Sequence, residues 1–153
     1  MNAKLNVQKK QKESYSGKKK RHTVKDLIVI DGLNAQIICI DEAKGSVHDF
    51  EIFKQSGIHI HDDILLVGDK GFKGVCAIYA RSLIPFKKPR KGELTAEQKA
   101  FNSYLSNFRM LIEHVNRRIK RFKILQIRYR NKQLKHLLRV SLICGLYNYE
   151  LGV

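Results

Sequence analysis

Two carboxylates stand where the surrounding residue types suit divalent-metal chemistry on a phosphodiester. Asp69 directly follows the apolar residues 64–68, and ligands collect at the carboxyl ends of strands in open α/β sheets. Glu113 lies beside an apolar helical stripe, with Arg109 and Arg117 four residues away on either side to contact phosphates. Each acid also has a simpler interpretation, because Asp followed closely by Gly commonly forms a turn and Glu at this spacing from Arg forms surface ion pairs. Taken alone, each carboxylate leaves both interpretations open.

Four further side chains are weaker candidates for metal chemistry. His48 and Asp49 open a predicted helix at residues 48–55, where they would either support a metal site or cap the helix. His59 and His61 would share one face of an extended segment, as metal ligands do. An exposed loop is the simpler interpretation for this second pair.

The charge of the chain indicates an anionic partner, above all a nucleic acid. Lys and Arg number 30 against 14 Asp and Glu, for a formal net charge of +16. Residues 1–25 and 82–153 are strongly basic, whereas residues 26–81 hold more acids than bases. Basic segments bind a phosphate backbone by releasing counterions, and phosphodiester enzymes place metal-binding carboxylates in such a positive field. A well-solvated basic surface is the alternative. The predicted phosphate contacts are Lys18, Lys19, Lys20, Arg21, Lys87, Lys88, Arg109, Arg117, Arg118, Lys120 and Arg121.

Length and composition narrow the class of protein. A chain of 153 residues suits one domain, and 43% hydrophobic residues suffice for a core, which argues against a wholly disordered chain. No apolar run approaches the roughly 18 residues of a membrane helix, and the basic N-terminus lacks the apolar segment of a secretory signal. The scattered Cys39, Cys76 and Cys144 argue against a disulfide framework or a zinc knuckle. We therefore expect a cytoplasmic protein with no membrane contact.

Hydrophobic patterning predicts alternating strands and helices. Residues 1–17 lack a hydrophobic period and are typical of a mobile arm or a severed linker, which leaves residues 18–151 for the domain. Strands are expected at 22–31 and 35–43, joined as a hairpin by a turn at 32–34. The other predicted elements are a helix at 48–55, a buried parallel strand at 64–72, a short helix at 75–80, a short strand from 82 and two long helices. This order indicates an α/β domain, or an α+β domain, with a mixed sheet.

The two long helices are predicted from their apolar stripes. The first is opened by Thr95, with Glu97 in its first turn, and extends over about seven turns. Its stripe consists of Phe101, Leu105, Phe108, Ile112, Val115, Ile119 and Phe122. The second extends to about Tyr149, with a stripe of Leu134, Leu137, Leu138, Leu142 and Leu146. We expect both stripes to face the core.

Six segments in order resemble the catalytic domain of DDE-type transposases from bacterial insertion sequences, in particular the group represented by insertion sequence five. These segments are SYSGKKKRHTVK (14–25), GSVHDFEIF (45–53), LLVGDKGFKG (65–74), IPFKKPRKGELTAEQKAFN (84–102), RMLIEHVNRRIKRFKIL (109–125) and YNYEL (147–151). The resemblance implies a ribonuclease-H-like, retroviral-integrase-like fold with flanking helices. It also implies cut-and-paste DNA chemistry at transposon ends and targets, with two divalent ions, Mg²⁺ or Mn²⁺.

The resemblance also assigns roles to single residues. Asp69 in GDKGF matches the family's second catalytic Asp and Glu113 its catalytic Glu, so both would be catalytic metal ligands. His48 and Asp49 match a His-Asp pair that supports the site. The family's first catalytic Asp lies in a strand upstream of the YSGKKKRHT motif, whereas residues 1–13 contain no Asp. The resemblance therefore implies a C-terminal part of a transposase that begins after the first catalytic strand and the DNA-recognition region.

A missing central strand and Asp would have two consequences. The bridge between two metal ions would be lost, so we expect one loosely held ion at most. The sheet would also be incomplete, which leaves three alternatives. Residues 24–30 and 64–67 would close the gap, another polypeptide would fill it, or the chain would fold poorly.

Three hypotheses about function follow. The first is a truncated transposase catalytic domain, inactive alone and active when an upstream transposase fragment supplies the first Asp in trans. The second is a catalytically inactive remnant that binds DNA or a full-length transposase. The third is a product without function.

Overall fold

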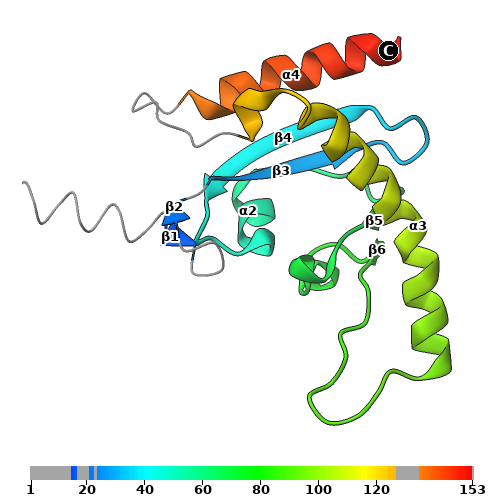
Figure 1. Ribbon diagram of the computed structural model, residues 1–153. Coiled ribbons are helices and arrows are strands. Elements are labelled where there is room, and N and C mark those ends of the chain that lie inside the picture. Colours follow the sequence, from blue (N-terminus) through cyan, green and yellow to red (C-terminus); the bar gives the residue numbers. More distant parts are fainter. Residues whose placement is uncertain (1–14, 17–20, 23, 127–134, 153) are drawn as a thin grey trace, which may run out of the picture.

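The computed structural model describes residues 15, 16, 21, 22, 24–126 and 135–152, which form a mixed α/β arrangement (Figure 1). These residues hold three two-stranded sheets and three α-helices. From residue 24 onward the order of strands and α-helices is the expected one, with a 3₁₀ helix at Val75–Ala77 in place of the short helix predicted at 75–80, whereas the short strands at 15–16 and 21–22 are not predicted. Within the described residues, no helix is both long enough and apolar enough to cross a membrane.

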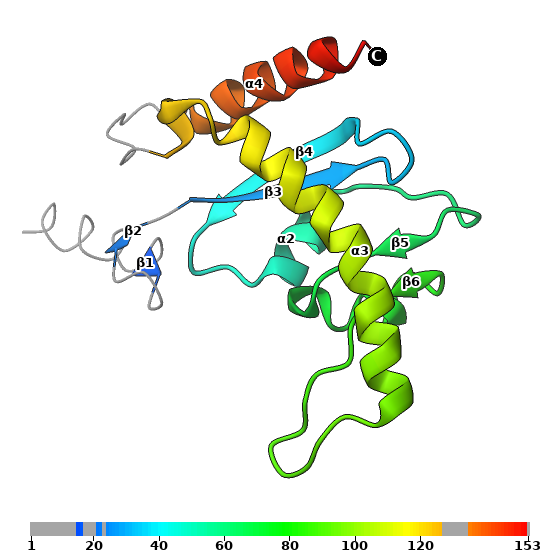
Figure 2. The same cartoon turned by 45° about the vertical axis from the view of Figure 1, so that its right-hand side comes forward.

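The predicted hairpin is confirmed as strands β3 (Val24–Ile30) and β4 (Ile37–Lys44), which pair antiparallel. Their turn is fixed by its own polar side chains, because the Asp31 carboxylate accepts a hydrogen bond from the Leu33 N–H at 2.8 Å. Helix α4 covers one face of the hairpin and α2 lies against the other (Figures 1 and 2). The hairpin is therefore the layer between two helices.

A second, shorter pair is formed by β5 (Leu66–Val67) and β6 (Ser82–Leu83), which are parallel as expected. The observed strand is much shorter than the strand predicted at 64–72, because the 3₁₀ helix η1 (Lys70–Phe72) begins soon after it. A second 3₁₀ helix, η2 (Val75–Ala77), lies between η1 and β6. The prediction of a buried strand is wrong here, because Leu66 and Val67 are only partly buried and the preceding Ile64 and Leu65 are 55% and 53% exposed.

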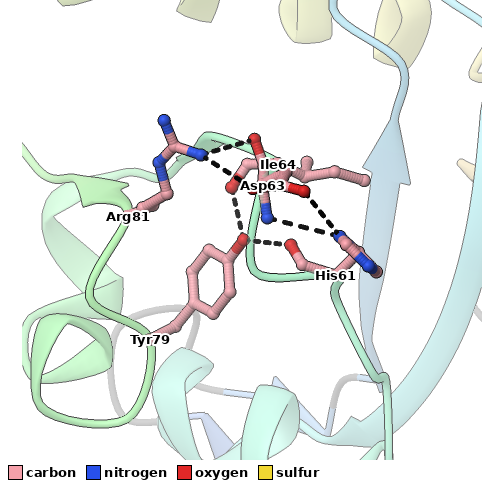
Figure 3. A network of polar contacts seen from close by, with 5 residues as sticks. All are labelled: His61, Asp63, Ile64, Tyr79 and Arg81. Carbon is pink, nitrogen blue, oxygen red and sulfur yellow. Dashed lines mark hydrogen bonds and ion pairs between the residues drawn. The ribbon is translucent and has the colours of Figure 1, made fainter.

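A polar network holds the loop before β5 onto the chain before β6 (Figure 3). The Tyr79 hydroxyl reaches the backbone carbonyls of both His61 and Ile64. The Arg81 guanidinium donates to the Asp63 carbonyl at 3.1 Å and forms an ion pair with the Asp63 carboxylate. His61 also contacts the Asp63 carboxylate, at 3.5 Å. The surroundings of His61 thus show a loop-fixing role for this residue.

The strands do not join into one sheet within the described part of the chain. A third pair, β1 (Tyr15–Ser16) with β2 (Arg21–His22), lies by itself. Strands β3 and β5 belong to different sheets. Of the three alternatives left open for an incomplete sheet, direct pairing of residues 24–30 with 64–67 is not observed, because among the described residues β3 pairs with β4 and β5 pairs with β6.

Helix α2 (Asp49–Gln55) and the long helix α3 (Ala96–Ile119) form where the sequence predicts them. Helix α3 starts with a capping box, in which the Thr95 hydroxyl accepts from the Gln98 N–H at 3.2 Å and the Gln98 side chain accepts from the Thr95 N–H. Its stripe faces inward at Leu105, Val115 and Ile119, which are at most 2% exposed. The helix runs from the hairpin past the β5–β6 pair (Figure 2), so it connects the two sheets.

Helix α4 (His136–Leu151) follows the 3₁₀ turn η3 (Lys123–Leu125) and packs on the hairpin. The Asn148 side chain clamps β4, accepting from the Ile37 N–H and donating to the Ile37 carbonyl, both at 2.9 Å. The predicted leucine stripe is wrong at Leu138, Leu142 and Leu146, which are 52–63% exposed. Leu137 is partly buried, and Leu134 lies outside the described residues. The buried face consists of Val140, Ile143, Cys144 and Tyr147. The helix is apolar on both sides, and the side that packs against the hairpin is the one with the β-branched and aromatic residues.

Candidate functional site

Asp69 lies at the carboxyl end of β5, as the sequence predicts. It is the N-cap of η1, and its carboxylate accepts a hydrogen bond from the Lys70 N–H at 2.6 Å. The Ile84 side chain packs closely against the preceding Gly68, where a Cβ would lie 2.7 Å from it. The Asp69 side chain is 55% exposed. Asp69 is thus both a turn residue and an accessible carboxylate.

Glu113 lies on α3 and is brought to Asp69 by a shared arginine. The Arg109 guanidinium lies 3.9 Å from the Asp69 carboxylate through Nε and 3.7 Å from the Glu113 carboxylate through Nη2. The Glu113 side chain is 62% exposed. The predicted helix-surface ion pair therefore exists, and it also joins two acids that lie 44 positions apart in the sequence. We call Asp69, Arg109 and Glu113 the Asp69–Glu113 site.

The start of α2 packs beside this site. The Asp49 carboxylate accepts from the Lys25 ammonium at 2.9 Å. A Cβ on Gly71 would lie 2.6 Å from the same carboxylate, so a side chain there would displace Asp49 where it meets the turn after Asp69. His48 is the N-cap residue of α2, is exposed and makes no side-chain cap. Asp49 contacts the turn that carries Asp69, whereas no contact brings His48 to it among the described residues.

Basic side chains gather on the C-terminal half of α3. An open hollow there is lined by Glu113, Asn116, Arg117, Lys120, Arg121 and Gln126. Arg118 points elsewhere, with its guanidinium 3.4 Å from the Glu150 carboxylate and 5.1 Å from the Tyr147 ring centre. Lys87 and Lys88 are exposed between β6 and α3. Lys18, Lys19 and Lys20 lie outside the described residues, as does the side chain of Arg21.

The Asp69–Glu113 site lacks a third close ligand among the residues that the structure describes. No further Asp, Glu, His or Cys there completes a group of three around these two acids. Asp31 and Asp41 instead form hydrogen bonds within the hairpin. Their carboxylates accept hydrogen bonds from the backbone N–H groups of Leu33 and Glu42, respectively, both at 2.8 Å.

A different group of three potential metal ligands comes together at the N-terminal end of α4, which we call its base. The ligand atoms of Asp26, Glu42 and His136 all lie within 4.8 Å of one another. Sequence reasoning missed this group. The hairpin register places Asp26 opposite Glu42, but His136 joins them only through the packing of α4, which no local pattern reveals.

Comparison with known proteins agrees with the resemblance found in the sequence. Residues 3–148 match the family described as DDE superfamily endonuclease. A probable transposase for insertion sequence element IS702 from Microchaete diplosiphon is 44% identical over 145 residues, which cover 95% of this chain and 52% of that protein. The chain thus spans about half the length of this relative. No solved structure matches it. The chain belongs to the DDE superfamily endonuclease family.

Proposed function

We propose that this chain forms part of the ribonuclease-H-like catalytic domain of a DDE transposase, in which Asp69 and Glu113 are catalytic metal ligands. The observation that carries the proposal is their meeting around Arg109, although one ends a short strand and the other lies in a long helix. The family match and the transposase relative support it.

The donor set of the Asp69–Glu113 site suits Mg²⁺ or Mn²⁺. Both ligands are carboxylates, which hard divalent ions prefer. The positively charged guanidinium of Arg109 already lies near both carboxylates, which indicates that a single cation can interact with both of them. When bound, the ion would polarise a phosphodiester and activate water. Asp49 and Lys25 support the site indirectly, by holding the turn that carries Asp69.

The basic hollow beside Glu113 is proposed to hold the DNA backbone. Arg117, Lys120 and Arg121 line it together with Glu113. Phosphates bound by these cations would pass directly beside the carboxylates. Arg109 would leave the acids when metal binds and pair with a phosphate oxygen.

Strand cleavage needs more than the two described carboxylates. Two-ion catalysis requires ligands that bridge the ions, and the relative is about twice as long as the matched region. We propose that a third carboxylate comes from another part of the transposase or from a separate upstream polypeptide. We propose that a strand carrying it pairs with β3 or β5, which belong to different two-stranded sheets.

A cleavage assay tests this proposal. The purified chain is incubated with Mg²⁺ or Mn²⁺ and DNA duplexes from the ends of its own insertion element, with and without the upstream polypeptide. We expect cleavage only in the complemented reaction, abolished by Asp69→Asn or Glu113→Gln. The matched variants Asp62→Asn and Glu97→Gln, which change exposed acids elsewhere, should keep it. Cleavage by the chain alone, or cleavage that survives Asp69→Asn, would contradict the proposal.

A second candidate function is a catalytically inactive protein that binds DNA or a full-length transposase. The pairing of Arg109 with both acids favours it, because the guanidinium offsets part of their negative charge without a metal ion. The neighbouring cations Arg117, Lys120 and Arg121 can then hold a phosphate backbone in the absence of metal. Under this alternative the chain binds DNA equally well with EDTA and with Mg²⁺, and the complemented reaction shows no cleavage.

A further inference from the structure

The base of α4 holds three potential metal ligands from three different elements. Asp26 lies on β3, Glu42 faces it on β4, and His136 is the first residue of α4. The His136 Nε2 lies 2.9 Å from the Asp26 carboxylate, and these two side chains are only 12% and 30% exposed. Both acids lie on the hairpin face that carries Ile28 and Ile40, which pack against the α4 core.

The Glu42 carboxylate is incompletely satisfied in this place. Its Oε2 atom is buried and has no hydrogen-bond partner among the described residues. Burial raises the pKa of the Glu42 carboxyl, and the neighbouring Asp26 raises it further, while His136 opposes the shift. An unpaired buried carboxylate oxygen costs free energy. A cation between the three groups would supply the missing partner.

We propose that Asp26, Glu42 and His136 form a second cation site, which binds a borderline divalent ion such as Zn²⁺ and fastens the first turn of α4 to the hairpin. This inference does not rest on the proposed transposase chemistry, because it uses none of the residues of the Asp69–Glu113 site.

The donor set favours zinc over magnesium. An imidazole nitrogen with two carboxylate oxygens suits Zn²⁺, whereas Mg²⁺ prefers oxygen ligands and retains its water. Tetrahedral zinc with bonds of about 2.0–2.2 Å holds its ligand atoms roughly 3.4 Å apart. The three ligand atoms lie within 4.8 Å of one another, so small side-chain rotations would bring all three to the separation that a bound zinc ion needs. Three protein ligands leave a fourth position for water.

Isothermal titration calorimetry of ZnCl₂ into the full chain, first freed of metal with EDTA, tests the site. We expect a Zn²⁺ site whose affinity falls by about tenfold or more in His136→Gln and in Asp26→Asn. His59→Gln is the matched control, since it removes an exposed imidazole outside the cluster. The double variant Asp69→Asn, Glu113→Gln should bind Zn²⁺ at the cluster like the parent chain, which separates this site from the proposed catalytic one.

Thermal denaturation supplies a second readout. Zn²⁺ should raise the melting temperature of the parent chain and of His59→Gln, but not that of His136→Gln. Circular dichroism in EDTA shows whether His136→Gln folds, and Asp26→Asn provides the same comparison if it does not. Absence of Zn²⁺ binding by the parent chain would overturn the proposal. Unchanged affinity in both His136→Gln and Asp26→Asn, or loss of binding in His59→Gln, would overturn it too.

Discussion

If Asp69 and Glu113 bind a metal ion as we propose, Arg109 competes with that ion for the two carboxylates. Its contacts of 3.9 and 3.7 Å are long and lie at an exposed surface. Exposed ion pairs of this kind contribute only about 0–1 kcal/mol each. We expect a divalent ion with two direct carboxylate ligands to outweigh that energy, so that Arg109 would leave the acids when the proposed metal binds.

Replacing Arg109 by Gln should therefore raise the affinity for Mn²⁺. We expect a gain of about fivefold, which corresponds to roughly 1 kcal/mol of lost competition. Titration calorimetry with MnCl₂ measures it, and Arg117→Gln is the control because Arg117 lies in the hollow and in neither ion pair. A weaker affinity in Arg109→Gln would show that the arginine positions the acids rather than competing for them.

The three cysteines differ in burial, and their reactivity should follow. Cys144 is buried in the α4 core, where burial and the charge of Asp26 raise the pKa of its thiol to about 11. At about pH 8 only roughly one Cys144 thiol in a thousand is then ionised, and the thiolate is the reactive form. We expect iodoacetamide to modify the exposed Cys76 and to spare Cys144 in the folded chain, as mass spectrometry of tryptic peptides would show. Equal labelling of both would mean that α4 does not stay packed on the hairpin.

At the level of single elements, local signals predict well where helices begin and poorly which side they bury. Thr95 and the stripe through Leu105 and Val115 define α3 within a residue of its observed start. In α4, apolar residues occupy both sides, so the spacing of its leucines is no guide to the buried face. Tertiary contacts, such as the hydrogen bonds of the Asn148 side chain with the Ile37 backbone on β4, determine which side of α4 is buried. The spacing of apolar residues in the sequence carries no information about such contacts.

The capping box of α3 should matter for stability because that helix carries Glu113. Thr95→Ala removes the acceptor for the Gln98 N–H, and we expect a loss of about 1 kcal/mol in the free energy of unfolding. Urea denaturation followed by circular dichroism measures it. Ser103→Ala, on the exposed side of the same helix, should be neutral or slightly stabilising. If both variants behave alike, the cap contributes nothing and packing alone fixes the start of α3.

At the scale of the whole molecule, motifs predict which acids lie near one another better than they predict how the strands assemble, while the chemistry of those acids stays a prediction. Asp69 and Glu113 are named by motif and are found together. The separation of the strands into three small sheets is not predicted, since hydrogen bonding between distant strands depends on the packing of the whole chain. The Asp26–Glu42–His136 group is missed for the same reason, because the cluster exists only where α4 meets the hairpin.

The net charge of +16 should appear as a steep salt dependence of DNA binding. Each phosphate that a basic side chain neutralises adds about 0.9 to the slope of log Kd against log salt concentration. Replacing both Arg117 and Arg121, which line the hollow beside Glu113, by Gln should reduce that slope by about 2.

The matched double variant is Lys54→Gln with Lys99→Gln. These lysines already pair with Glu51 at 3.6 Å and Glu93 at 3.0 Å. Removing them changes the net charge by the same amount but removes no proposed phosphate contact, so the slope should stay close to that of the parent chain. Fluorescence anisotropy with a labelled DNA duplex between about 50 and 200 mM salt gives both slopes. Equal losses in the two double variants would mean that total charge, rather than the hollow on α3, determines how the chain holds DNA.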